Sequence, residues 1–301
     1  MHLRILGSAA GGRFPQWNCG CVNCAAVRRN TFKGKARTQT QIALSADGSR
    51  WFLAGASPDL AFQIEATAAL HPRATRNSPI AGVVLASADL DHVVGLLLLR
   101  ELQPLRVYGA PSVLRILREE NSMFGMLNRA EPQVVWTEMR VGAFPLLDST
   151  GKDSGLCCEP IYLSGRYPVY VKSPGLAREE STAGLFFTSP DGRRVAYLPA
   201  IGKLTGLLLA KINGVDVLLF DGTFWSDDEL IQIQGSGETA RQMGHIPVEE
   251  SLALLKNIKV GRRIYVHINN TNPILNEAGL EHAKVREAGW KVAEDNWHLE
   301  L

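Results

Sequence analysis

The chain has 301 residues, of which 46% are hydrophobic and 21% charged, and its formal net charge is only +2. A chain of this length can bury a core without disulfides, and its composition is typical of globular proteins. The near-neutral charge argues against binding to nucleic acid or to an anionic membrane. The longest apolar run, at 93–100, is too short to span a bilayer. The opening residues lack the long apolar core of a secretory signal, so we expect a cytoplasmic protein without membrane insertion.

Short aliphatic and β-branched runs alternate with amphipathic stretches along the chain. The runs predict strands at 2–6, 40–46, 50–55, 80–87, 105–109, 155–163, 183–189, 193–199, 215–221 and 262–268. The amphipathic stretches predict helices near 58–70, 93–103, 111–120, 247–257 and 277–288. Strands joined by short turns, with helices that must cover the sheet faces, favour an α+β fold: a four-layer αββα sandwich of two mixed sheets. No repeat or long linker divides the sequence, so we expect a single domain over residues 1–301.

The segment at 82–101 carries the strongest chemical signal. A buried strand is predicted to end near Ser87, and an apolar helix to begin after His92. Asp89 and Asp91 then lie with His92 on a turn, where side chains can converge on one point. The N-terminus of a helix beside this turn would favour carboxylates. The alternative is that one aspartate simply caps the helix and His92 is incidental.

A second predicted strand end contributes His267. Alone, a histidine in this place is more often structural than a metal ligand. Together with Asp91 and His92, however, it supplies two imidazoles and one carboxylate, the ligand set of mononuclear non-haem Fe(II) sites that keep positions open for dioxygen and substrate. Zn²⁺ could take the same ligands plus water. We therefore predict one divalent metal, Fe²⁺ or another, at these three residues, with Asp89 as a further ligand, an acceptor that orients an imidazole, or a helix cap.

Three of the five cysteines form a cluster, Cys19, Cys21 and Cys24. Thiolates are soft ligands suited to closed tetrahedral zinc sites, and C-x-C-x-x-C spacing lets one loop provide three corners. The competing interpretation is a set of ordinary reduced cysteines. We predict a structural Zn²⁺ that fastens the N-terminal loop and stabilises the fold.

These motifs carry a family resemblance. SADLDH at 87–92 aligns with the H-x-H-x-D-H signature of metallo-β-lactamase-fold hydrolases, and the opening segment at 5–24 resembles the first strand and loop of that superfamily. YVHINNTNP at 265–273 resembles its terminal metal-ligand segment. FDGTFW at 220–225 and GHIPVEESLALL at 244–255 resemble motifs of the ribonuclease Z branch. Taken together, the chain resembles the family of coenzyme PQQ (pyrroloquinoline quinone) biosynthesis protein B over essentially its whole length, which implies a metallo-β-lactamase-like sandwich.

The departures from the hydrolase pattern are equally informative. Ser87 and Asp89 stand where the hydrolases have two histidines. Another histidine and a bridging aspartate are also missing, from the segments at 164–171 and 196–202. A dinuclear hydrolytic centre needs two metals that clamp a shared oxygen, so one metal is the expected count.

The resemblance also bears on residues outside the predicted ligand set. It implies a proton-transfer or substrate-orienting pair of Asp221 and His245, although His245 could instead only begin the helix at 247–257. Relatives with a similar cysteine cluster complete their zinc site with a histidine, where this sequence has Asn270. The fourth ligand therefore stays open among His245, Asn270 and water.

The resemblance implies a role in PQQ biosynthesis. The first hypothesis is a mononuclear iron oxygenase that hydroxylates the tyrosine part of a peptide-derived Glu–Tyr precursor, an oxidoreductase that works alongside other PQQ biosynthesis proteins. The second is a non-catalytic carrier that helps to transport PQQ or its precursor to the periplasm. The third is a metal-dependent hydrolase inherited from the fold, although a fold by itself does not establish an activity.

Overall fold

The structure is a computed structural model that describes residues 1–129 and 133–301. Its contacts divide the chain into two compact units, each built from segments far apart in the sequence. Unit 1 comprises Met1–Leu6, Gln41–Arg194 and Asn296–Leu301, and unit 2 comprises Gly7–Thr40 and Val195–Asp295. That the two units make a single domain stays a prediction.

Unit 1 holds a mixed sheet in the order β14-β1-β2-β3-β4-β5-β6. Its strands are β1 (His2–Gly7), β2 (Gln41–Ser45), β3 (Trp51–Ala54), β4 (Ile80–Val84), β5 (Leu105–Gly109), β6 (Val134–Glu138) and β14 (Trp297–Glu300). Strand β1 pairs antiparallel with β14, and β2 with β3, whereas β3 to β6 run parallel. Strand β3 is buried along its whole length, which is typical of a sheet covered on both faces and explains its uninterrupted apolar sequence.

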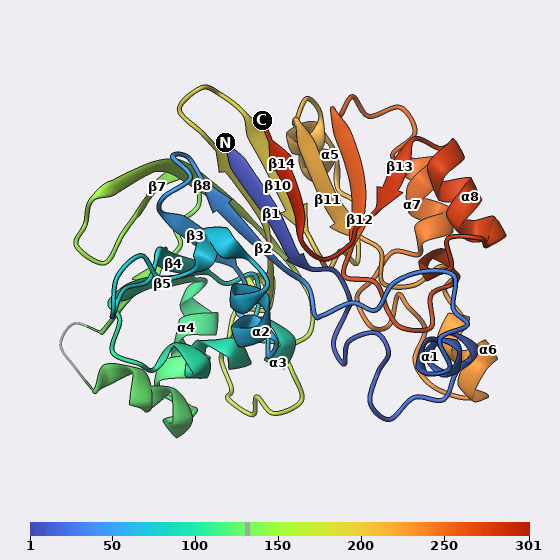
Figure 1. Ribbon diagram of the computed structural model, residues 1–301, viewed down its shortest axis with the longest axis horizontal. Helices are drawn as coiled ribbons and strands as arrows, with labels where there is room; N and C mark the ends of the chain where they lie inside the picture. The colour runs from blue at the N-terminus through green and yellow to red at the C-terminus, as the bar shows by residue number, and fades with distance from the viewer. Residues whose placement is uncertain (130–132) are drawn as a thin grey trace. The chain divides into compact units, whose positions relative to one another are not determined.

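Helices and a second group of strands complete unit 1. The antiparallel strands are β7 (Phe144–Leu147), β8 (Asp153–Leu163) and β9 (Thr182–Thr188). The helical segments are α2 (Leu60–Glu65), η1 (Ala68–Leu70), α3 (Leu90–Val93), η2 (Val94–Leu99), α4 (Pro111–Arg118), η3 (Ser122–Asn128) and η4 (Arg178–Glu180). Pro111 starts α4, where its missing N–H costs no helical hydrogen bond. Helix α4 packs against β5 and β6 (Figure 1).

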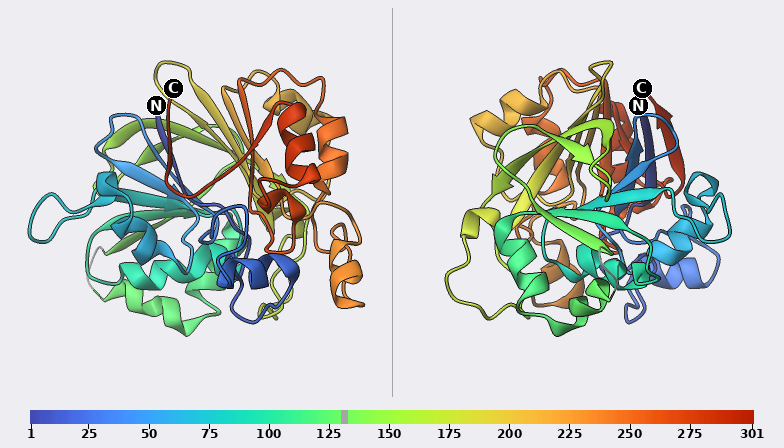
Figure 2. Two further views of the ribbon diagram at one scale, coloured as in Figure 1. Left: turned by 45° about the vertical axis from the view of Figure 1, so that its right-hand side comes forward. Right: turned by 90° about the vertical axis from the view of Figure 1, so that its left-hand side faces the viewer.

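Unit 2 is built on parallel strands in the order β13-β12-β11-β10. They are β10 (Arg194–Leu198), β11 (Val217–Asp221), β12 (Arg262–Val266) and β13 (Trp290–Val292), and the helical segments are α1 (Val22–Arg28), α5 (Gly206–Ile212), α6 (Glu229–Gln234), α7 (Val248–Leu254), η5 (Pro273–Leu275) and α8 (Leu280–Glu287). The left view of Figure 2 shows the orange and red helices α7 and α8 against these strands, and α8 contacts β13. Tyr265 and Trp290 stack with ring centroids 4.2 Å apart in the core.

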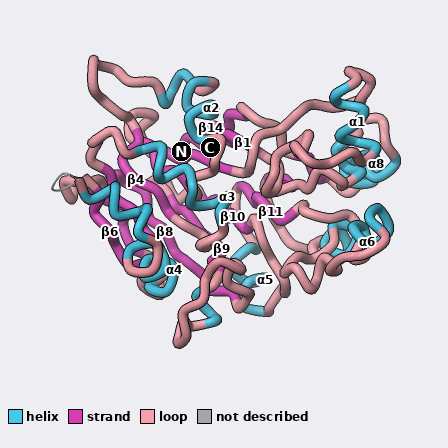
Figure 3. The backbone as a smooth tube through the Cα atoms, turned by 90° about the horizontal axis from the view of Figure 1, so that it is seen from below, coloured by secondary structure: helices cyan, strands magenta, loops and turns pink. Residues whose placement is uncertain are grey.

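The parallel arrangement in unit 2 positions its polar residues. Strands β10, β11 and β12 all end at the same edge, so the loops that follow them meet there. The chain between β11 and α7 is mostly loop, and Figure 3 shows the short helix α6 bordered by loops. Side chains on these loops are free of the sheet hydrogen bonds and can turn toward one another.

All ten predicted strands overlap observed strands, whereas β6, β7, β13 and β14 were not predicted. The helix predicted at 93–103 was wrong at its start. Helix α3 begins at Leu90 because the His92 N–H bonds the Asp89 carbonyl at 2.8 Å, and the chain continues as the 3-10 segment η2. In the described part of the chain, no helix is long and apolar enough to cross a membrane. The cytoplasmic location stays a prediction.

Gly95 offers a test of how tightly unit 1 is packed behind α3. A Cβ atom at this position would lie 2.2 Å from the Ser57 carbonyl oxygen, which is backbone and cannot swing away. We expect Gly95→Ala to lower the free energy of unfolding by about 3 kcal/mol in a chemical denaturation experiment, because the backbone must shift. Gly125→Ala is the matched control, since its Cβ would meet no atom within 4 Å. Equal stability of the two variants would contradict this packing.

Candidate functional site

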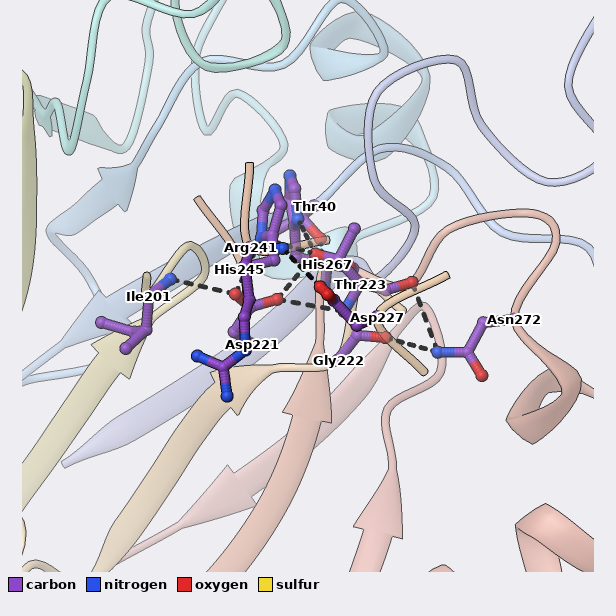
Figure 4. A network of polar contacts seen from close by, with 10 residues as sticks. All are labelled: Thr40, Ile201, Asp221, Gly222, Thr223, Asp227, Arg241, His245, His267 and Asn272. Carbon is purple, nitrogen blue, oxygen red and sulfur yellow. Dashed lines mark hydrogen bonds and ion pairs between the residues drawn. The ribbon is translucent and has the colours of Figure 1, made fainter. Parts of the chain in front are cut away.

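A buried carboxylate organises the polar edge of unit 2. Asp221 is the last residue of β11 and is fully buried. One oxygen, Oδ2, accepts from the Ile201 N–H at 2.9 Å and from His245 Nδ1 at 2.8 Å. The other, Oδ1, accepts from the N–H and the hydroxyl of Thr223 at 3.0 and 2.6 Å. Figure 4 shows these groups converging on the carboxylate.

These contacts decide the charge of Asp221. Burial by itself would raise its pKa, but the electrostatic attraction and hydrogen bond of His245, the electrostatic attraction of His267 and the hydrogen bond from Thr223 outweigh burial and lower the pKa. The carboxylate is therefore ionised at neutral pH and acts only as an acceptor. The predicted pairing of Asp221 with His245 is present in unit 2, while its role in catalysis stays a prediction.

His267 directly follows β12 and has an unusual backbone. Its φ is 56°, a left-handed conformation that is uncommon outside glycine. Its N–H donates to the Thr40 hydroxyl at 2.9 Å, and its ring Nδ1 lies 2.8 Å from the Thr223 hydroxyl. The ring also stacks on that of His245, with centroids 5.5 Å apart. This surrounding structure fixes the imidazole direction.

The SADLDH segment lies in unit 1, after β4. The Ser87 hydroxyl donates to Asp89 Oδ2 at 2.8 Å and lies 2.9 Å from His92 Nδ1. Asp89 occupies the N-cap position of α3, but its side chain makes no capping hydrogen bond. An Asp91 oxygen lies 4.0 Å from Nε2 of the buried His92. Asp89 therefore contacts the residue that orients an imidazole, while its role as a metal ligand stays a prediction.

The predicted metal ligands are divided between the units. Asp91 and His92 belong to unit 1 and His267 belongs to unit 2. The ligand types fit a divalent cation, because two imidazoles and a carboxylate are good donors for both iron and zinc. That the three bind one ion stays a prediction.

The three clustered cysteines come together in unit 2. Their sulfur atoms lie within 4.8 Å of one another, a spacing close to that of thiolates around a tetrahedral zinc ion. The Asn270 side-chain nitrogen lies 3.1, 3.6 and 3.4 Å from the sulfurs of Cys19, Cys21 and Cys24. Of the open candidates for a fourth ligand, Asn270 is thus beside the cluster, whereas His245 pairs with Asp221.

The surroundings of the cysteine cluster shift the pKa values of its thiols in opposite directions. Burial raises the pKa of Cys24 to about 11, with repulsion from Cys21 adding to the effect against the opposing Gln16 N–H. For Cys19, burial is outweighed by the Cys21 N–H and neighbouring side chains, which lower the pKa. Three adjacent thiolates repel one another, and a bound dication would remove that repulsion.

One polar turn connects the cysteine loop to the buried carboxylate. The Asn23 amide donates to the carbonyl oxygens of Asn270, Thr271 and Asn272 at 3.2 Å each. The Asn272 amide in turn donates to the Gly222 carbonyl at 2.9 Å. The turn that follows His267 is therefore held on both sides.

Two residues of this region were not predicted from the sequence, Thr223 and Glu229. Thr223 has a detectable signal, because D-x-T spacing lets a hydroxyl bond the carboxylate two residues earlier. Glu229 accepts from the Trp225 N–H at 2.6 Å and from the Thr271 hydroxyl. No local sequence pattern distinguishes Glu229 from a solvent-exposed acid, because an acidic residue in the first turn of a helix is common.

Comparison with known proteins shows which family the chain resembles. Residues 50–268 match the β-lactamase superfamily domain. The chain is 40% identical over the full length of both proteins to coenzyme PQQ synthesis protein B of Methylorubrum extorquens. It is 39% identical to the protein of the same name from Gluconacetobacter diazotrophicus, with 99% of each chain covered.

Solved structures give the same fold. The crystal structure of Zn²⁺-bound PqqB from Methylobacterium extorquens matches with a TM-score of 0.92 and 40% identity over all of both chains. A diphosphatase of the PhnP family matches at a TM-score of 0.71 with 18% identity, covering 100% of this chain and 96% of its own, which shows shared fold alone. The expected metallo-β-lactamase fold is confirmed.

The cysteine cluster yields a direct prediction. Cys21→Ser should lower the bound zinc by tenfold or more and the unfolding temperature by about 10 °C, because a closed zinc site contributes folding free energy. Metal analysis and calorimetry on the purified protein would measure both. Cys157→Ser is the control, since Cys157 lies in β8 outside the cluster. A zinc content that falls without any loss of stability would contradict a structural role.

Glu229 predicts a pH dependence of stability. Burial raises its pKa to about 7 from 4.5, against hydrogen bonds from Thr271 and the Trp225 N–H that lower it. The stabilisation by its bound proton is complete below pH 4.5 and is lost as the pH rises through 7. Relative to Glu229→Gln, the unmodified protein should lose about 3 kcal/mol of unfolding free energy between the two ends of that range.

The measurement is urea denaturation at a series of pH values. The exposed Glu249 provides the control, because Glu249→Gln should leave the pH profile unchanged. A profile for Glu229→Gln parallel to that of the unmodified protein would show that Glu229 titrates alike in the folded and unfolded states.

Proposed function

The chain belongs to the β-lactamase superfamily and, within it, to the family of coenzyme PQQ synthesis protein B, and on that premise we propose that it takes part in PQQ biosynthesis as a mononuclear non-haem iron oxygenase. Its substrate in this proposal is a peptide-derived precursor in which glutamate and tyrosine are cross-linked. The reaction is hydroxylation of the tyrosine ring. Other PQQ biosynthesis proteins are the expected partners in delivering and receiving this substrate.

Asp91, His92 and His267 would hold the metal. The observation that supports this assignment is the same for both histidines: each is buried, and the ring Nδ1 of each is engaged by a hydroxyl at 2.9 or 2.8 Å. When bound, Fe²⁺ supplies positions where dioxygen and substrate can meet.

The contacts of Ser87 favour one metal over two. In place of two additional imidazoles, the segment has a serine and an aspartate whose side chains bond each other at 2.8 Å. Ser87 also contacts His92, so both side chains are engaged in orienting a ligand. This arrangement favours the oxygenase over a dinuclear hydrolase.

The proposed reaction balances with an external reductant. One oxygen atom of O₂ replaces hydrogen at a ring carbon to give C–OH. The other oxygen atom leaves as water, with two protons and two electrons supplied by a small-molecule reductant. The phenol proton of the substrate would pass to Nε2 of His245, whose Nδ1–H is held by the ionised Asp221.

Zinc at the cysteines would be structural. Cys19, Cys21 and Cys24 supply three ligands in this proposal, and Asn270 supplies the fourth through its amide oxygen. A half-turn of the Asn270 amide exchanges its oxygen with the nitrogen that now faces the three sulfurs.

The activity can be tested by anaerobic loading with one equivalent of Fe²⁺, followed by addition of the cross-linked Glu–Tyr peptide, a reductant and air. We expect dioxygen consumption together with a product heavier by one oxygen atom. His92→Ala and His267→Ala should each lower Fe²⁺ affinity by at least about a hundredfold, because each removes a ligand. His71→Ala is the control, since His71 bonds the Glu65 carbonyl on the surface of unit 1.

Other outcomes would favour other functions. Unchanged Fe²⁺ affinity in both ligand variants would refute the metal assignment. Tight binding of PQQ without dioxygen consumption would favour the carrier, and turnover of phosphodiesters with Zn²⁺ or Mn²⁺ would favour the hydrolase.

A further inference from the structure

Two chains of contacts, one in each unit, share the same order of chemical groups. In unit 1 a carboxylate, a hydroxyl and an imidazole follow one another as Asp89, Ser87 and His92. In unit 2 the same order is Asp221, Thr223 and His267. In both, the imidazole nitrogen next to the hydroxyl is Nδ1. We infer that Ser87 and Thr223 are positioning residues that hold these histidines as the Nδ1–H tautomer, so that the lone pair for a metal is on Nε2.

The hydrogen bonds of the Thr223 hydroxyl determine which ring nitrogen of His267 carries the proton. Its oxygen lies 2.6 Å from Asp221 Oδ1, and two oxygens this close require a proton between them. A carboxylate has only acceptors, so the hydroxyl proton points to Asp221. The oxygen then has only lone pairs left for His267 Nδ1 at 2.8 Å, and this nitrogen must carry a proton. His245 Nδ1 also lies 3.1 Å from the Thr223 oxygen, and its proton, which bonds Asp221 Oδ2, can share the second lone pair.

A competing acceptor leads to the same result. The His267 carbonyl oxygen also lies 2.9 Å from the Thr223 oxygen. If the hydroxyl donated there, it would again have no proton for the His267 ring. Only donation into Nδ1 would give the other tautomer, and this would leave the Asp221 and Thr223 oxygens facing each other without a proton.

The Ser87 hydroxyl uses its one donor and both of its acceptor sites. A hydroxyl has one donor and two acceptor sites. The oxygen donates to Asp89 Oδ2 at 2.8 Å and accepts from the Asp89 N–H at 3.2 Å. The remaining acceptor site faces His92 Nδ1 at 2.9 Å, so this nitrogen also carries its proton.

This arrangement has a consequence for metal affinity. Metal-bound histidines are generally oriented by a hydrogen bond from the other ring nitrogen, and loss of that partner typically weakens metal binding by about 10- to 100-fold. Here each ring donates to a hydroxyl, and that hydroxyl in turn donates to a carboxylate. The inference rests on the proposed metal role of His92 and His267, but the tautomers can be measured without a metal.

The first experiment is long-range ¹H–¹⁵N NMR of the metal-free full chain labelled at histidine. His92→Asn and His267→Asn variants assign the two rings. We expect the neutral form of both rings to show a protonated Nδ1 and an unprotonated Nε2. A protonated Nε2 on both neutral rings would overturn the inference without any variant of the hydroxyl residues.

The second experiment compares variants with and without the hydroxyl. Thr223→Val and Ser87→Ala should mix the tautomers of His267 and His92 respectively and weaken Co²⁺ binding at the nitrogen–oxygen site by about 10- to 100-fold. Thr223→Ser and Ser87→Thr keep the hydroxyl and should stay within about threefold of the unmodified protein. The strong thiolate-to-cobalt absorption of any ion at the cysteines keeps the two sites apart in the titration.

The outcomes separate this inference from the proposed function. If NMR shows the expected tautomers but Co²⁺ binds only at the cysteines, the proposed metal site is refuted and the positioning role is supported. Normal Co²⁺ binding and unchanged tautomers in Thr223→Val and Ser87→Ala would refute the positioning role alone. If Thr223→Val fails to fold, Thr223→Ala and the NMR spectrum of the unmodified protein still show whether the hydroxyl sets the tautomer of His267.

Discussion

The polar edge of unit 2 depends on the burial of the Asp221 carboxylate. An ionised group removed from water is tolerated only where donors replace the lost hydration. Here both oxygens are supplied, by two backbone N–H groups, one hydroxyl and one imidazole. Each of these donors is thereby fixed in direction, and with them the loops that follow β10 and β11.

The turn from His267 to Asn272 connects the surroundings of Asp221 to the cysteine loop within unit 2. At its start, the left-handed His267 is held by hydroxyls of Thr40 and Thr223. At its end, Asn23 and the side chain of Asn270 tie it to the cysteine loop. In the proposed function, the structural zinc and the metal ligand His267 would thus lie at opposite ends of this turn. A change in the conformation of the cysteine loop would then displace His267 through a short stretch of backbone.

The SADLDH segment of unit 1 departs from the hydrolase pattern at two positions. Replacing two imidazoles by Ser87 and Asp89 removes metal ligands but creates a hydrogen-bonded pair beside His92. The remaining imidazole gains a partner that directs its ring. Under the proposed function, the same two residues that rule out a second metal also direct the ring of a ligand to the first.

The sequence by itself determined the fold class, ten of the strands, the cysteine cluster and the candidate ligands at strand ends. These features depend on local pattern, because apolar runs, turn residues and short spacings are encoded within a few positions. Tertiary structure alone decided that Thr223 contacts His267, 44 residues away, and that Asn270 faces sulfurs about 250 residues distant. It also decided the burial of Glu229 and the early start of α3. Such contacts arise when separate loops pack at one sheet edge, and no local pattern encodes which of their side chains will meet.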